Sequence, residues 1–481
     1  MNIKLIFRVL GFLSLVVGIA MLLALIVSLI YGEHDTKAFL FSSGVAAATG
    51  GIILLLTKNA SRDIGKREGF IIVSLSWIIF SFFGSLPYIL SGSIPNFTDA
   101  FFETISGFTT TGSSILSDIE ALPHGILFWR SLTQWLGGMG IIVLSLAILP
   151  VFGIGGMQLF MAEVPGPTPD KISPRIRQTA KTLWIIYLGF TITETLLLWV
   201  GGMSFYDAIC HSFTTMATGG FSTKQASIGH WDSPFIQYVI VLFMFFAGTN
   251  FTLSYIAIKG KFGRVLKDEE FKYYFLFVAG FTILISIGLI FTTSLGIEQA
   301  FRDALFQVVS IITTTGFATA DYLLWQPILT ILIFVLFFFG GSAGSTGGGI
   351  KIMRIVILFK NSYYELRRMI HPNAVIPVKF NKHSVDAKII TNVLAFFMLY
   401  FVIFGFSTVI FTFIEPDLPS AMGAVATSLG NIGPGLGNVG PAENFAHVAP
   451  AGKWFLSFLM LLGRLELFTV LVLFSPTFWK E

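Results

Sequence analysis

The chain has 481 residues, of which 54% are hydrophobic and 12% are charged, whereas ordinary soluble domains carry about 25% charged residues. This composition excludes a soluble enzyme and indicates that lipid covers most of the chain. A single cysteine, Cys210, excludes an internal disulfide framework, and the seven histidines include no pair at metal-ligand spacing. The net charge of +4 is spread between apolar runs, so it does not indicate nucleic-acid binding.

Apolar runs long enough to cross a bilayer, about 20 residues each, recur along the chain and predict ten spans. The first run is too long for the core of a secretion signal, roughly 7–15 residues, so we expect a retained helix. The predicted spans are approximately 9–31, 38–57, 69–92, 126–150, 180–201, 234–258, 273–293, 326–358, 387–414 and 453–475.

Charge is distributed unequally between the two sets of connecting segments. With an even number of spans both termini lie on one side, and most of the lysines and arginines lie on that side as well. The opposite side is acidic, with residues such as Asp99, Asp207 and Asp303. Because basic loops stay in the cytoplasm, both termini are predicted to be cytoplasmic. The acidic outer face should concentrate cations.

A gap-free frame of 14 residues occurs four times after the first two spans. Its copies read DAFFETISGFTTTG from Asp99, DAICHSFTTMATGG from Asp207, DALFQVVSIITTTG from Asp303 and SAMGAVATSLGNIG from Ser420. The first position is always a favoured helix N-cap residue, the eighth is Ser or Thr, and the last is Gly. A single Thr-Gly cluster is ordinary turn chemistry, but four copies in one frame indicate an internal repeat.

Each frame predicts a short helix that starts at its capping residue and ends in an extended Thr/Gly stretch. About ten helical residues cover roughly 15 Å, which is half a bilayer. Because each frame lies between two spans, the repeating unit is helix, re-entrant half-helix with loop, and helix. Non-helical backbone at membrane depth is tolerated where it lines a water-filled cavity. Four such units around an axis predict a pore.

The end of each frame supplies groups that can replace the water shell of a monovalent cation. Rings of backbone carbonyls suit this task, and the final Gly permits positive φ. The C-terminal ends of the half-helices also favour a cation. The candidate filter residues are Thr110, Thr111, Gly112, Thr218, Gly219, Gly220, Thr314, Thr315, Gly316, Asn431, Ile432 and Gly433.

These features resemble the Trk/Ktr/HKT superfamily of potassium transporters, and the two leading helices and the stretch from Asn431 to Gly437 resemble its TrkH branch. The resemblance implies an all-α polytopic membrane protein of the bacterial inner membrane, with four tandem helix–pore-loop–helix repeats around a pseudo-fourfold axis. It also implies K⁺ as the transported ion, no organic cofactor on this chain, a homodimer, and a cytosolic TrkA-like regulatory subunit that binds NAD(H) or ATP/ADP. The corresponding units are 1–62, 63–175, 176–265, 266–370 and 371–481.

A glycine-rich segment interrupts the span at 326–358 and follows the third filter. It lacks any large side chain and cannot form a straight helix. The resemblance assigns it a gating role, while a simple packing hinge is the alternative. It lacks the ending of a phosphate-binding loop. The segment comprises Gly340, Gly341, Ser342, Ala343, Gly344, Ser345, Thr346, Gly347, Gly348 and Gly349.

Arg464 lies in the middle of the last predicted span, where an unpaired arginine costs about 2.5–3.5 kcal/mol. The equivalent helix positions in the other repeats follow Gly138, Gly248 and Gly341, which predicts that Arg464 projects toward the axis beneath the filter. There its charge would be a barrier to cations, which is also the role that the resemblance implies. The alternative is an ion pair with Glu194 or Glu466. Asn431 breaks the symmetry of the filter, so we expect weaker discrimination against sodium than in a symmetric channel.

Several other groups complete the prediction. Glu103 and His211 share the fifth frame position and are interpreted as packing or mouth residues. The basic segment from Lys360 to Lys388 could bind the regulator or anionic lipid. A proton- or sodium-coupled secondary transporter is the alternative function, but it would require intramembrane carboxylates beside inverted repeats. An intramembrane enzyme is disfavoured because no catalytic constellation falls within a span.

Overall fold

The computed structural model describes residues 1–60, 65–140 and 176–480. Within these ranges the fold is helical apart from one two-stranded hairpin, formed by β1 (Lys379–Phe380) and β2 (His383–Ser384). The all-α prediction is therefore confirmed. Six helices are long and apolar enough to span a membrane, and two bent helix pairs could add a span each. Of the span predicted at 126–150, residues 141–150 lie outside the described residues.

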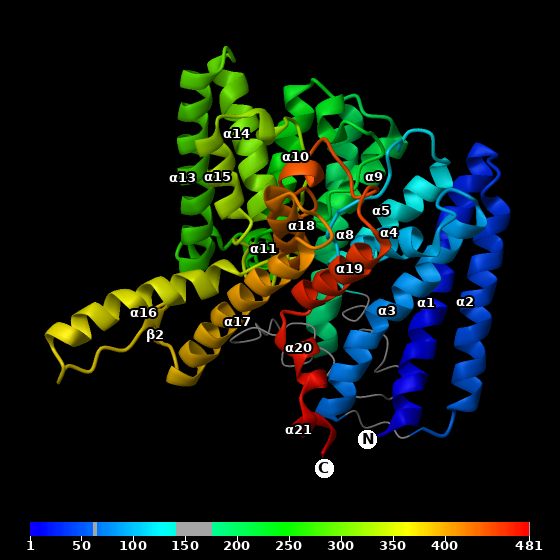
Figure 1. Cartoon of the computed structure of the whole chain (residues 1–481), viewed down its shortest axis with the longest axis horizontal. Coiled ribbons are helices and arrows are strands. Elements are labelled where there is room, and N and C mark those ends of the chain that lie inside the picture. The colour runs from blue at the N-terminus through cyan, green and yellow to red at the C-terminus, as the bar shows by residue number, and fades with distance from the viewer. Residues whose placement is uncertain (61–64, 141–175, 481) are drawn as a thin grey trace.

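Two antiparallel helices precede the repeats, α1 (Ile3–Tyr31) and α2 (Thr36–Leu56). They pack closely because small residues face each other: a Cβ on Gly50 would lie 2.5 Å from the carbonyl oxygen of Gly11. Ser43 Oγ donates to the Gly18 carbonyl at 2.8 Å across the same interface. The pair lies at one side of the molecule, against α3 and α5 (Figure 1).

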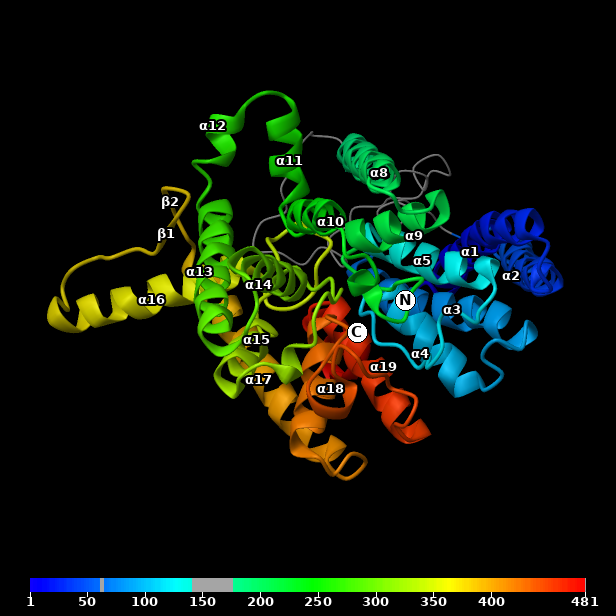
Figure 2. The ribbon, with the colours of Figure 1, turned by 90° about the horizontal axis from the view of Figure 1, so that it is seen from above.

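Four units of the predicted kind follow, each with an outer helix, a half-helix and an inner helix. Seen from above, they surround a common centre (Figure 2). The first two units contain α3 (Lys66–Leu90), α4 (Phe97–Phe108), α5 (His124–Gly138), α8 (Ile176–Val200), α9 (Phe205–Met216), α10 (Pro234–Ala247), α11 (Phe251–Ile258) and α12 (Phe262–Val265). The last two contain α13 (Glu269–Thr292), α14 (Ile297–Ile312), α15 (Pro327–Leu336), α16 (Ile352–Ile370), α17 (Ala387–Phe411), α18 (Leu418–Gly430), α19 (Pro450–Arg464), α20 (Phe468–Leu471) and α21 (Pro476–Trp479). Short 3₁₀ turns cover 227–230, 322–324, 437–439 and 472–474.

The inner helices of the second and fourth units are broken, whereas the sequence predicts continuous spans at 234–258 and 453–475. The chain bends by 109° between α10 and α11 and by 110° after α19. Asn250 starts α11 afresh by accepting from Thr252 N at 2.7 Å. Glu466 and Leu467 take positive φ values of 52° and 60°, which end α19. Only the break predicted in the third unit is visible in the sequence, as a glycine run.

The predicted capping residues of the half-helices are wrong, by about one turn in α4, α9 and α18 and by about two turns in α14, which begins after Gly296 rather than at Asp303. The N-caps of α4, α9 and α18 are Asn96, Ser204 and Asp417, whose side chains accept backbone N–H groups of the first turn. Asp99 and Asp207 therefore lie inside the first turn, where carboxylates also favour the helix dipole. Ser204 and Asp207 bond to each other in the manner of a capping box.

Candidate functional site

The ends of the four frames share an unusual backbone conformation. The twelfth frame position has positive φ in every copy, with values of 53° at Thr110, 53° at Thr218, 59° at Thr314 and 54° at Asn431. Positive φ is a genuine outlier for a β-branched residue such as threonine. Strain of this kind concentrates at functional sites, where the surrounding structure holds it in place.

The last glycines of the frames form a closed ring of contacts with the thirteenth position of the next unit. A Cβ on Gly112 would lie 2.2 Å from Gly219 O, and one on Gly220 would lie 2.0 Å from Thr315 O. A Cβ added to Gly316 would lie 1.9 Å from Ile432 O, and one added to Gly433 would lie 2.9 Å from Thr111 O. The thirteenth and fourteenth frame positions of all four units therefore come together, with unit one against unit two, two against three, three against four, and four against one.

Hydroxyl and amide side chains hold this ring from behind. Ser106 Oγ donates to Ser113 O at 2.6 Å, and Ser310 Oγ donates to Phe317 O at 2.7 Å, so in units one and three the eighth frame position holds the residue after the final glycine. Gln134 supports the second frame, donating to Gly219 O at 2.6 Å and accepting from Phe221 N at 3.0 Å.

The glycine-rich segment lies directly against the ring, at the C-terminal ends of the half-helices α9 and α14. Gly348 N donates to Thr314 Oγ1 at 2.7 Å, and Thr346 Oγ1 donates to Met216 O at 3.0 Å. The segment is also tied to the break of the second unit, since Ser342 N donates to Gly248 O at 2.8 Å. It is therefore an ordered segment that touches two of the four frames.

Arg464 connects the same segment to the first filter frame. Its Nη1 donates to Thr110 Oγ1 at 3.1 Å and to Thr346 O at 2.7 Å. Its Nη2 donates to the carbonyls of Gly137 at 2.5 Å and Gly138 at 3.1 Å, which end α5. A cation at a helix C-terminus is favourable. These bonds offset the cost of placing an arginine at membrane depth.

These contacts place Arg464 against Thr110 of the first frame, and its position in an ion pathway stays a prediction. Glu466, one of its two alternative partners, forms an ion pair with Arg354 of α16 instead. The guanidinium of Arg354 also lies 3.9 Å from the centre of the Phe396 ring. Arg354 and Glu466 thereby join α16 to the loop that follows α19.

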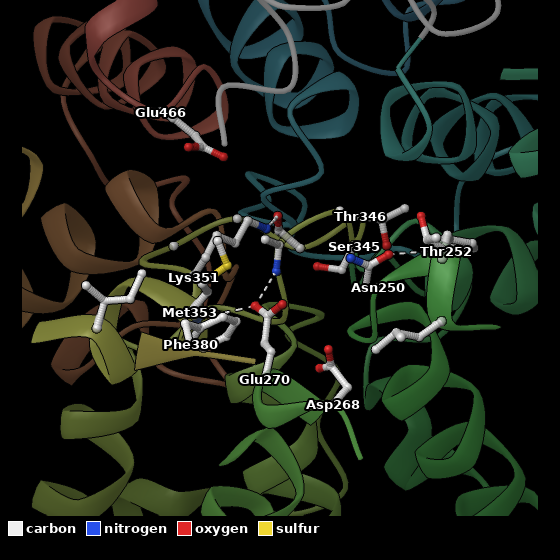
Figure 3. Close-up of a pocket in the computed structure, with 18 of the residues that line it drawn as sticks. Asn250, Thr252, Asp268, Glu270, Ser345, Thr346, Lys351, Met353, Phe380 and Glu466 are labelled. Atoms are coloured by element: carbon white, nitrogen blue, oxygen red, sulfur yellow. Dashed lines mark hydrogen bonds between the residues drawn. The ribbon is translucent and has the colours of Figure 1, made fainter. Parts of the chain in front are cut away.

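Glu270, in the first turn of α13, is a site residue that the sequence does not predict. Its Oε1 accepts from Ala343 N at 2.7 Å and from Met353 N at 3.2 Å, so one buried carboxylate holds the glycine-rich segment and the start of α16 (Figure 3). Lys351 Nζ donates to Gly347 O inside the segment. These side chains line a cavity of about 640 Å³ beside the glycine-rich segment.

Comparisons with known proteins agree with this architecture. The TrkH family of cation transport proteins matches residues 35–481. The chain belongs to the TrkH family. It is therefore a membrane transport protein and not an enzyme.

Similar proteins cover the whole chain. The Trk system potassium uptake protein TrkH of Escherichia coli K12 is 44% identical over 489 residues, and that of Halomonas elongata is 41% identical over 484 residues, with 100% of each chain covered. The crystal structure of the potassium transporter TrkH from Vibrio parahaemolyticus matches with a TM-score of 0.90 and 39% identity, again over 100% of both chains.

Proposed function

We propose that this chain takes up K⁺ across a bacterial inner membrane through the ring formed by its four filter frames. The closed order of glycine and carbonyl contacts is the observation that carries the proposal. Backbone carbonyls of Thr111, Gly219, Thr315 and Ile432 belong to one ring, and carbonyl rings can replace the hydration shell of K⁺. The potassium uptake function of the E. coli and Halomonas elongata relatives supports the same ion.

In this proposal the glycine-rich segment 340–349, which we call the plug, and Arg464 close the pathway on the cytoplasmic side. The plug touches the filter frames through Gly348 and Thr346, and Arg464 adds a positive charge beneath Thr110. Opening therefore requires the plug to leave its bonds. A cytosolic TrkA-like subunit with bound NAD(H) or ATP/ADP would supply that work, and the chain would act as a homodimer with both termini in the cytoplasm.

Replacing Glu270 with alanine should raise the flux that occurs without a regulatory partner. The change removes the acceptor that holds Ala343 N and Met353 N, so the plug loses its bond to α13. We expect radiolabelled Rb⁺ uptake into proteoliposomes to increase severalfold.

Glu269→Ala is the matched control for this change. The neighbouring carboxylate pairs with Lys360 at 2.6 Å and accepts from Asn381 N at 3.1 Å, and these bonds tie it to α16 and the hairpin rather than to the plug. Equal increases in both variants, or none in Glu270→Ala, would contradict the latch function of Glu270.

Coupling to protons or sodium is the alternative, and Glu194 is its main candidate. This carboxyl group is fully buried on α8. In a channel-like pathway its charge state has no role, so Glu194→Gln should transport Rb⁺ at the wild-type rate. Loss of uptake in a variant that still elutes as a folded species in size-exclusion chromatography would favour coupling.

The experiment that tests the proposed function is Rb⁺ uptake driven only by an inside-negative potential. Proteoliposomes receive equal pH and equal Na⁺ on both sides. For competition, unlabelled K⁺ is added outside in one series, and in a second series Na⁺ is raised equally on both sides. We expect uptake that K⁺ suppresses at lower concentration than Na⁺. Uptake that appears only after a proton or sodium gradient is imposed would overturn the channel-like proposal.

A further inference from the structure

The fifth frame position carries side chains that contact the chain just beyond the filter. We call the residues that follow each filter glycine in the chain the exit stretch; the name refers to the backbone leaving the filter, not to the ion. It comprises 113–115 in unit one, 221–223 in unit two and 317–320 in unit three. Glu103 accepts from Ile115 N at 2.9 Å and from Ser114 Oγ at 3.0 Å. His211 Nε2 and Ser222 Oγ are 2.9 Å apart, and Gln307 Nε2 donates to Ala320 O at 3.2 Å. In the fourth unit the position is Ala424, which has no polar group.

Arg130 of α5 extends this support from one unit to the next. Its Nε donates to Glu103 Oε1 at 2.6 Å, and its Nη1 donates to Ser222 O at 2.9 Å. The guanidinium carbon lies 3.5 Å from the centre of the Phe221 ring. The pair therefore joins the exit stretch of unit one, through Glu103, to that of unit two.

Both charges are taken out of water. Glu103 has 0% and Arg130 has 2% of its surface exposed. A buried ion pair is weak evidence for stability alone, because desolvation offsets the attraction. Here each charged group is instead used to hold backbone: Glu103 binds Ile115 N and Arg130 binds Ser222 O. Ile115 lies three residues after the filter glycine Gly112, and Ser222 lies two residues after the filter glycine Gly220.

We propose that Glu103 and Arg130 are positioning residues for ion selectivity. Neither belongs to the filter segments; together they fix the spacing between the first and second filter segments by anchoring the chain that leaves each. The inference deepens the proposed function and rests on it. In the fourth unit Tyr322 Oη, from unit three, donates to Gly435 O at 2.7 Å in place of a fifth-position side chain. Loosening units one and two should therefore let the ring adapt more readily to a smaller ion.

The test measures selectivity rather than rate. In proteoliposomes, the ratio of the Na⁺ and K⁺ concentrations that halve Rb⁺ uptake is compared between variants. We expect Glu103→Gln and Arg130→Lys each to lower this ratio by about tenfold while uptake persists. The double variant Glu103→Gln with Arg130→Lys should lose less than the two single losses combined, because the two residues act through one shared contact.

Asp99→Asn is the matched control. Asp99 lies one turn before Glu103 on the same half-helix and pairs with the buried Lys453 at 2.6 Å, so the change also neutralises a carboxylate beside a buried cation. Its side chain bonds to α19 through Lys453 and its backbone N–H to the cap Asn96, rather than to an exit stretch. We expect its ratio to equal that of the wild type.

The outcomes separate this inference from the proposed function. A wild-type protein without preference for K⁺ over Na⁺ would overturn the proposed function itself. Wild-type preference that both Glu103→Gln and Arg130→Lys retain would overturn only the positioning role. If Glu103→Gln does not elute as a folded protein in size-exclusion chromatography, the ratio measured for Arg130→Lys decides. If neither variant folds while Asp99→Asn does, the pair serves assembly of the fold, and the positioning role in selectivity is overturned as well.

Discussion

Replacing Gly316 with alanine should reduce Rb⁺ uptake by about tenfold or more, because the filter ring has no room for the added atom. A Cβ at this position would lie 1.9 Å from Ile432 O and 2.8 Å from Pro434 Cδ. The backbone φ of +80° adds a cost of about 1–2 kcal/mol for any residue with a Cβ. The collision involves main chain, which cannot rotate away, so the third and fourth filter segments must separate.

Gly202→Ala separates the collision from the backbone strain. Gly202 has a φ of +106°, yet a Cβ added there would meet no atom of the described residues within 4 Å. This variant should lose some stability and keep its uptake rate per folded protein. Equal uptake in Gly316→Ala and Gly202→Ala, measured in proteoliposomes of matched protein content, would show that the ring is not the ion pathway.

Replacing Arg464 with alanine should raise partner-independent Rb⁺ flux by about tenfold or more, because two restraints disappear together. A unit charge about 4 Å from a cation is worth ~4 kcal/mol at an effective dielectric of ~20, and that repulsion is removed. The plug also loses the bond between Arg464 Nη1 and Thr346 O.

Arg464→Gln distinguishes the two effects. Glutamine can still donate to a carbonyl, so it keeps part of the restraint on the plug while removing the charge. A flux as high as that of Arg464→Ala would assign the effect to charge, and a flux near the wild type would assign it to the bonds. A lower flux in both variants would contradict the barrier role. Arg67→Ala is the control, because it also removes an arginine, and the Nη2 of that arginine donates to Lys480 O near the end of the chain.

The four frames and their positive-φ ends could be located from the sequence because the signal is local. Thr110 and Gly112 lie two residues apart in a frame that recurs without gaps, so a repeat identifies all four copies. The glycine run at 340–349 was equally visible, since its composition alone excludes a straight helix. Arg464 was found because a charge within an apolar run requires an explanation.

The missed features depend on contacts between distant residues. Glu270 binds Ala343, which is 73 residues away in the chain, and Arg130 lies 27 residues from Glu103. The pattern of apolar residues does not show where a helix bends. The sequence therefore predicted continuous spans at 234–258 and 453–475, although the helices break after Ala247 and Arg464. The capping error arose because Asp99 and Asn96 are both good N-cap residues, and the earlier one is used.

Anomalous diffraction from crystals grown in Rb⁺ tests the central claim most directly. If the four filter frames form the pathway for K⁺, the strongest anomalous density should lie on the axis of the ring, enclosed by the backbones of Thr111, Gly219, Thr315 and Ile432. Replacing Rb⁺ with Na⁺ should remove that density. Rb⁺ density bound elsewhere, beside Glu194 for example, with none inside the ring, would contradict the account.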